Sequence, residues 1–159
     1  MTAYPSPPAS YDSSETESPA PPKGTHLEAL GFSWTPPKGW KRTEDETSVR
    51  YTSPADTQQI VASVTQDFGD LFPTWQAANA SLRGKNDHHL IRLGQTDFQG
   101  YPAATWEYTY TSRGIGLLVI DFGFSDGART YEINTTYHES LGRGARATYD
   151  KVVDSFTPW

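Results

Sequence analysis

The residues best suited to hold a metal ion stand together at Asp87, His88 and His89. Imidazole and carboxylate groups are common ligands of transition metals. Adjacent residues of a β-strand point to opposite faces, so His88 and His89 reach one ion only if the chain bulges there. We therefore interpret both histidines as surface residues after a loop and predict no metal site. The alternative is a site that recruits Asp87 and His138.

Among the carboxylates, we single out Glu107 and Asp121 as those best placed inside predicted strands. Two carboxyl groups that face each other across adjacent strands can serve as general acid and general base in hydrolysis. A strand carboxylate more commonly lies on a wet face or pairs with an arginine, here Arg92 or Arg129. No serine is set apart as a partner for any of the histidines. We predict no catalytic residues, and a small hydrolase is retained as an alternative.

Large aromatic side chains are the third group of candidate functional residues. Trp34, Trp40, Trp106 and Tyr108 are candidates for a ligand or partner surface, for example a groove for a carbohydrate or a peptidoglycan fragment. A chain that is 35 % hydrophobic but 13 % aromatic must also bury its rings to obtain a core. Core packing is the favoured interpretation of the aromatic residues as a group.

Composition excludes several classes of protein. The net charge of -6 repels nucleic acid, and the basic residues Lys38, Lys41 and Arg42 are followed at once by acidic residues 44–46. Cysteine is absent, which excludes disulfides and thiolate sites. The glycine pairs at 114/116 and 142/144 are interpreted as turns, since neither lies between a strand and a helix of a dinucleotide-type unit, and we predict no nucleotide or other cofactor. No apolar run approaches the ~18 residues of a membrane span.

Residues 1–27 differ in composition from the rest of the chain. Six of the 12 prolines lie in the first 22 residues, among serines and acidic residues. Such a segment buries too little apolar surface to fold, and its prolines keep it extended. We predict a disordered Pro/Ser-rich tether at residues 1–27 and a single domain at residues 28–159. A spacer of this kind further predicts that the natural chain continues upstream of Met1.

Apolar and polar residues alternate along the domain as they do in a β-rich fold. Alternation of period two predicts β-strands, here at Gly31–Trp34, Trp40–Thr43, Ser48–Ser53, Gln58–Gln66, His89–Gln95, Ala103–Thr111, Gly116–Phe124 and Ala128–Thr136. Short links between the first four predict antiparallel pairing, and glycine-bearing turns between the last four predict a meander. Within Ala103–Thr111 the alternation predicts one aromatic face and one polar face.

Two amphipathic helices complete the prediction. Asp70 is placed to cap a helix that runs to about Arg83, with an apolar stripe along one side. A second helix is expected from about Leu141 to Phe156, and its two early glycines favour a start as late as Ala145. The predicted fold class is α+β, with a twisted antiparallel sheet of about six to eight strands covered by two helices.

Several motifs resemble those of a known family over residues 30–157. They are Gly31-Phe-Ser, Pro37-Lys-Gly-Trp40, Tyr51-Thr-Ser-Pro54, the run from Phe98 to Tyr108, and Asp154-Ser-Phe156. The chain resembles the extracytoplasmic C-terminal domains of actinobacterial, Streptomyces-type membrane serine/threonine kinases and related exported proteins. The family is similar in fold to the PsbP-like α/β/α sandwich, which implies a fold and not an activity.

The resemblance implies a function outside the membrane. In such kinases the catalytic domain is followed by a membrane helix, a Pro/Ser-rich spacer and a terminal domain. No kinase motif is present here, so any kinase activity belongs to an upstream segment. We expect a non-catalytic sensor-type domain, tethered to a membrane, that binds a small ligand, a cell-wall component or a protein partner. An accessory subunit of an envelope complex is the alternative.

Overall fold

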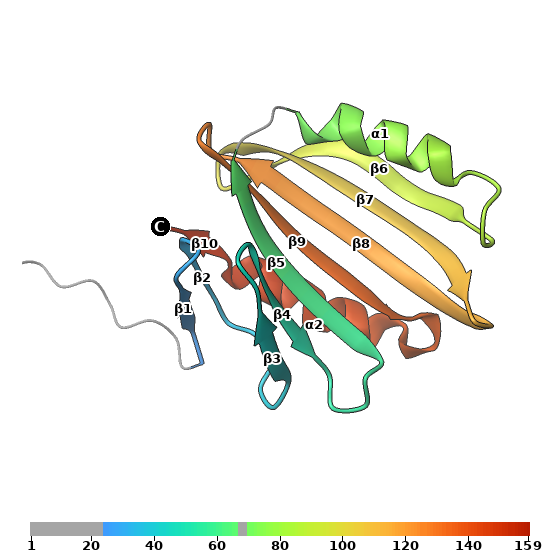
Figure 1. Cartoon of the computed structure of the whole chain (residues 1–159), viewed down its shortest axis with the longest axis horizontal. Coiled ribbons are helices and arrows are strands. Elements are labelled where there is room, and N and C mark those ends of the chain that lie inside the picture. Colours follow the sequence, from blue (N-terminus) through green and yellow to red (C-terminus); the bar gives the residue numbers. More distant parts are fainter. Residues whose placement is uncertain (1–23, 67–69) are drawn as a thin grey trace, which may run out of the picture.

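The computed structural model describes residues 24–66 and 70–159. Most of the predicted tether, residues 1–23, lies outside this part of the chain, so its disorder stays a prediction. The described residues form a large sheet, a small sheet and two α-helices (Figure 1). The first strand begins at His26, two residues before the predicted domain boundary at Glu28.

The large sheet has seven strands in the order β3-β4-β5-β9-β8-β7-β6, and every neighbouring pair is antiparallel. The strands are β3 (Lys41–Glu44), β4 (Ser48–Thr52), β5 (Gln58–Gln66), β6 (His89–Phe98), β7 (Tyr101–Ser112), β8 (Ile115–Ser125) and β9 (Arg129–His138). The predicted meander is therefore formed by β6 to β9, and β9 returns to pair with β5. This arrangement confirms the α+β class and the predicted number of strands.

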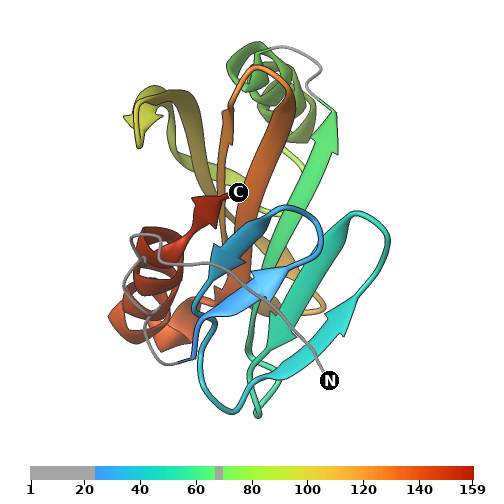
Figure 2. The ribbon, with the colours of Figure 1, turned by 90° about the vertical axis from the view of Figure 1, so that its left-hand side faces the viewer.

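The strand predicted at Gly31–Trp34 does not join the large sheet. It forms β2 (Phe32–Trp34), which lies between β1 (His26–Glu28) and β10 (Thr157–Pro158) in a separate three-stranded sheet. Both ends of the described chain meet there (Figure 2). Prolines at positions 36 and 37 interrupt the extended chain after β2, and the C-terminal residues occupy its remaining edge.

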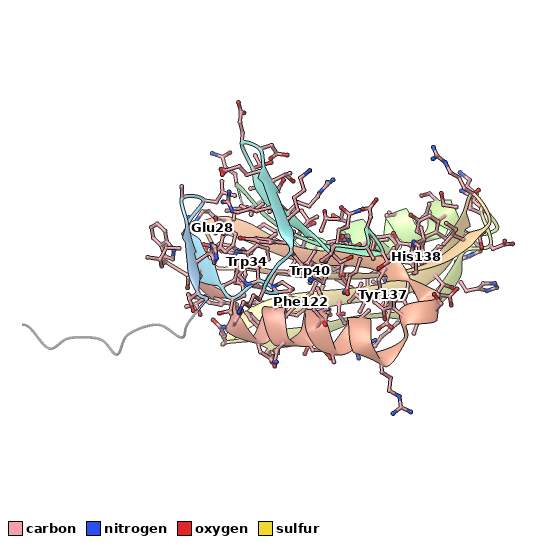
Figure 3. The ribbon with its side chains drawn as sticks, turned by 90° about the horizontal axis from the view of Figure 1, so that it is seen from below. Glu28, Trp34, Trp40, Phe122, Tyr137 and His138 are labelled. Carbon is pink, nitrogen blue, oxygen red and sulfur yellow. The ribbon has the colours of Figure 1, made fainter. Side chains whose placement is uncertain are left out.

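The helices lie on opposite faces of the large sheet. α1 (Leu71–Leu82) begins after Asp70, whose side chain accepts a hydrogen bond from the Phe72 amide, as predicted for the cap. α2 (Arg143–Ser155) follows a 3₁₀ turn at Glu139–Leu141 and begins between the two predicted starts. Gly142, with φ +58°, ends the 3₁₀ turn and allows the change of direction. Figure 3 shows α2 along one side of the strands.

Each face of the sheet has its own hydrophobic cluster. The α2-side cluster is the larger and contains the small sheet as well, with Phe32, Trp34, Ile60, Tyr131 and Phe156 fully buried. The α1-side cluster is built from Leu71, Trp75, Ala104 and Trp106. The rings stack and meet edge to face, as in Phe32 on Phe156 at 4.6 Å between centroids. Aromatic residues thus supply much of the core that the aliphatic residues leave unfilled.

Candidate functional site

The four aromatic residues predicted to form a ligand or partner surface do not come together. Trp34 and Trp40 belong to the α2-side cluster, whereas Trp106 and Tyr108 belong to the α1-side cluster. Trp34 is fully buried and Trp106 is 5 % exposed, so neither ring offers a surface to a ligand. Their role is packing. A ligand surface remains a prediction for the half-buried Trp40 and Tyr108.

Glu107 is buried on the α2-side face and is neutralised by a cation from α2. An Nη atom of Arg146 donates to Oε2 of Glu107 over 2.6 Å, and the side chains of Arg146 and Glu107 are 38 % and 7 % exposed. The predicted wet or polar face of β7 is therefore a buried one, because α2 covers Glu107 and Thr105. The partner is also not the predicted Arg92 or Arg129 but an arginine from the last helix.

Asp121 lies on the α1-side face, opposite to that of Glu107. It pairs with Trp106 of β7 in the strand register, while Glu107 pairs with Ile120. The two carboxylates therefore point away from each other and cannot share a proton or a substrate. This geometry removes the acid/base pair that the sequence left open for a hydrolase.

Asp121 has a different carboxylate neighbour, Glu132 of β9, which the sequence interpretation did not single out. Burial raises the pKa of Asp121, although Asn134 donates a hydrogen bond of 2.6 Å to its Oδ1 atom. Burial, followed by the charge of Asp121, raises the pKa of Glu132 to about 7. Leu71 of α1 and Cγ of Glu132 both lie against Gly123, so the helix helps to keep water from this carboxyl. The pair lines neither of the clefts described below.

The histidines do not assemble a metal site. The His88 ring packs at a tilt against Tyr108 with 5.0 Å between ring centroids, whereas His89 is exposed at the start of β6. Within residues 24–66 and 70–159, no three histidine, aspartate or glutamate side chains gather closely enough to hold a metal ion. The site that would recruit Asp87 and His138 is not formed among them.

A Gly-x-Ser-x-Gly pattern, Gly123 to Gly127, was missed by the sequence interpretation. In serine hydrolases this pattern forms a sharp turn between a strand and a helix. Here Ser125 ends β8 and leads through a hairpin to β9. Its hydroxyl accepts a hydrogen bond from the Gly127 amide over 3.1 Å, and it bonds to no histidine of the described chain. Ser125 is a turn residue and not a nucleophile held by a base.

The α1-side cleft, of about 500 Å³, lies between the start of α1 and strands β6, β7 and β8. Its walls include Leu71, Ala104 and Phe124, and its rim carries Asp70 and Asp97. Asp70 is already occupied as the cap of α1. Gln95, Thr96 and Ser125 also line this cleft, so polar and apolar groups both face its space.

The α2-side cleft, of about 350 Å³, lies between α2 and the middle of strands β6, β7 and β8. It is lined by apolar and charged side chains from both layers, namely Arg92, Thr105, Ile120, Phe122, Arg146, Tyr149, Asp150, Val153 and Asp154. Ion pairs already engage part of this set, because Arg146 binds Glu107 and lies 3.9 Å from Asp150. Arg92 and Asp154 form no ion pair within the described residues.

Comparison with solved structures supports the PsbP-like fold. The chain is similar to the cyanobacterial PsbP protein CyanoP from Synechocystis, with a TM-score of 0.62 and 14 % identity over 85 % of this chain and 91 % of that one. It is also similar to LpqN, involved in cell envelope biogenesis of Mycobacterium tuberculosis, with a TM-score of 0.60 and 16 % identity over 79 % and 82 % of the two chains. At these identities the likeness concerns the fold alone.

Family membership rests on a separate match. Neither helix of the described residues is long and apolar enough to cross a bilayer. A search of curated proteins found no match. The family model described as the serine/threonine kinase C-terminal domain matches residues 25–158, from the residue before β1 to the end of β10. As the sequence resemblance predicted, the chain belongs to the family of serine/threonine kinase C-terminal domains.

Proposed function

We propose that this domain is the extracytoplasmic receiving part of a membrane serine/threonine kinase. In this proposal it performs no catalysis, binds a ligand or partner outside the membrane, and is joined to the upstream kinase through the Pro/Ser-rich residues that precede β1. Family membership supports the link to a kinase, and the composition of the first 22 residues supports a spacer. The similar protein LpqN is involved in cell envelope biogenesis, which agrees with a location outside the membrane.

The observation that carries the proposal is how firmly β1, the strand nearest to the tether, is fixed to the body of the domain. Glu28 is 3 % exposed. It accepts a hydrogen bond from the Trp34 indole over 2.8 Å and forms an ion pair of 2.7 Å with Arg42 of β3. Figure 3 labels Glu28 and Trp34 where they meet.

This ion pair, between the buried Glu28 and an Arg42 side chain that is 34 % exposed, links the small sheet to the large one. Charge-assisted hydrogen bonds are short and directional, so they hold the two partners in one geometry. A displacement of the large sheet on binding would therefore move β1 and the chain that precedes it. A domain that transmitted nothing to the tether would not need this connection between the two sheets.

The test uses the longer reading frame, with the kinase upstream of this chain, in membranes of its own cells. We expect protease added to intact protoplasts to degrade the domain while the kinase domain survives. We also expect material from the cell envelope to change autophosphorylation of the kinase, and this change to disappear when residues 24–159 are deleted.

A matched pair of variants separates binding from transmission. Arg42→Gln removes the partner of Glu28, whereas Lys41→Gln changes an exposed neighbour on the same strand. We expect Arg42→Gln to retain envelope material but to weaken the phosphorylation response, and Lys41→Gln to behave as the wild type. A kinase that responds equally with and without the domain contradicts the proposal.

One observation favours the accessory-subunit alternative. Leu90 and Ile91 are 48 % and 52 % exposed on β6, which is an edge strand with a bulge between Leu90 and Arg92. Exposed apolar residues at a sheet edge are typical of contact surfaces. If the chain acts as a subunit, the native protein elutes in a complex of defined stoichiometry, and a Leu90→Ser/Ile91→Ser variant does not.

A further inference from the structure

We infer that the α2-side cleft binds a small zwitterion of the amino-acid or dipeptide type, with its carboxylate toward β6 and its ammonium group toward α2. The inference rests on the proposed function, since it names the class of ligand that the receiving domain takes. It stands on a hydroxyl, a guanidinium and a carboxylate that no hydrogen bond or ion pair of the described residues engages, and on an apolar wall between the two layers.

The hydroxyl belongs to Thr105, a residue of the cleft lining that is only 7 % exposed as a whole. It makes no hydrogen bond with any described residue. Among the described residues, His88 Nε2 is the side-chain atom that is both sealed from solvent and without a hydrogen-bond partner. The Thr105 hydroxyl also lacks a partner but is not sealed, so it is in contact with the space of the cleft. A ligand atom in that space can complete its hydrogen bonding.

The free guanidinium belongs to Arg92, on the edge strand next to Thr105. Arg92 pairs with Glu107 in the strand register and therefore points to the α2-side face, but the charge of Glu107 is already taken by Arg146. Two residues after Arg92 on β6, Gly94 pairs with Thr105 in the strand register and contributes no side chain. Arg92 and Thr105 thus provide a cation and a hydroxyl on one open stretch of the sheet, a combination that suits a carboxylate.

The opposite wall supplies negative charge. Asp154 of α2 lines the cleft without an ion pair among the described residues, and Asp150, one turn earlier, lies 3.9 Å from Arg146 with its side chain 59 % exposed. Tyr149 offers no further donor, because its hydroxyl bonds to the carbonyl of Ile133. A ligand that carried only negative charge would face these carboxylates, whereas a ligand with an ammonium group can bind them.

The remaining wall is apolar, and the space is small. Ile120, Phe122 and Val153 line the cleft between the two charged rims. A volume of about 350 Å³ accommodates an amino acid or a dipeptide with an aliphatic side chain, but not a folded peptide or an oligosaccharide of several rings. Charge at both ends and an apolar middle therefore select an aliphatic amino acid or dipeptide.

The test is an NMR titration of the full ¹⁵N-labelled chain with leucine and with alanyl-leucine. Two analogues serve as matched probes: leucinamide, which lacks the carboxylate, and N-acetyl-leucine, which lacks the ammonium group. We expect the zwitterions to shift the amides around Arg92, Thr105 and Asp154, and each analogue to bind at least about tenfold more weakly. Tenfold corresponds to ~1.4 kcal/mol, the order of one charge-assisted contact.

Three variants of β6 identify the site. A Cβ added at Gly94 meets no atom within 4 Å, so Gly94→Val is expected to fold and to fill the cleft beside Thr105. Gln95→Ala alters the next residue, which faces the α1-side cleft. We expect Gly94→Val and Arg92→Gln to abolish the zwitterion shifts, and Gln95→Ala to retain them.

Three results overturn the inference. The first is the absence of shifts with up to about 10 mM of either zwitterion, a concentration well above the weak end of specific binding. The second is equal binding of N-acetyl-leucine, which describes a plain anion site. The third is unchanged binding to Gly94→Val, which places the ligand elsewhere. None of these results affects the kinase response, so failure here is distinct from failure of the proposed function.

Discussion

The two faces of the large sheet treat a buried carboxyl group in opposite ways. On the α2-side face, Glu107 is neutralised by Arg146 at 2.6 Å. On the α1-side face, Asp121 and Glu132 have no basic partner among the described residues, and burial raises the pKa of both. Both faces belong to one sheet, so the difference comes from the helices that cover them.

The composition of the helices explains this contrast. Residues 71–82 of α1 contain no charged side chain, whereas α2 contains Arg143, Arg146 and Lys151. A buried carboxyl with a cation near it stays ionised, but one without a cation becomes easier to protonate. One sheet therefore holds a fixed ion pair on one face and a group that titrates near neutral pH on the other.

Breaking the ion pair has the largest expected effect. Arg146→Met keeps the length of the stem but leaves Glu107 buried without a partner, which we expect to lower the free energy of unfolding by about 3 kcal/mol, the lower end of the range for broken buried pairs. The lower end applies because the Arg146 side chain is 38 % exposed and therefore partly screened by water. Urea unfolding at pH 8 measures the loss.

The double variant Arg146→Met/Glu107→Gln serves as the control. Because a glutamine at position 107 carries no charge, we expect the double variant to recover much of the stability that Arg146→Met loses. If both variants are equally unstable, the loss comes from the packing of the arginine stem and not from the uncompensated charge.

The contrast can be sharpened on the other face with Glu132→Gln. The pKa of Glu132 is about 7 in the folded chain against 4.5 ordinarily, so the native state binds more protons than the unfolded state between these values. Stability contributed by protonated Glu132 is complete below about pH 4.5 and is lost as the pH rises through about 7. Glutamine has no charge to lose, so at pH 8 we expect Glu132→Gln to be more stable than the wild type, on the order of 2 kcal/mol.

Thermal unfolding from pH 4 to pH 9 tests this expectation. The gain should be small at pH 4 and should grow through the window between 4.5 and about 7. Glu46→Gln, at an exposed residue of the β3–β4 turn, provides the matched control and should follow the wild type throughout. A gain from Glu132→Gln that is the same at every pH would point to a change in packing.

Much of the fold follows from the local pattern of the sequence. Alternation of period two identified the seven strands of the large sheet, and the Asp70 cap identified α1. The small sheet did not follow, because β10 has only two residues and depends on contacts with β2, more than a hundred positions away. A strand this short carries no periodic signal.

The electrostatics were less predictable than the elements. The alternation within β7 separates Glu107 from Trp106, but it does not reveal which face each helix covers. The partner of Glu107 lies 39 residues later in the chain, so local charge patterns could not identify it. Glu132 stands between Tyr131 and Ile133 as an ordinary outward-facing strand residue, and only the position of Leu71 above Gly123 shows that water is kept from it.

The smallest expected effect separates the two causes that act on Glu132. Burial is the larger cause of its raised pKa, and the negative charge of Asp121 is the second. Asp121→Asn removes that charge while an amide oxygen remains to accept the hydrogen bond from Asn134. We therefore expect the pKa of Glu132 to fall in this variant but to stay above 4.5, because the burial is unchanged.

A pH titration of the side-chain carboxyl by ¹³C NMR measures the value directly. An unchanged pKa would mean that Asp121 does not influence Glu132, and a fall to the ordinary value would mean that charge, and not the cover of α1, distinguishes this face from the other.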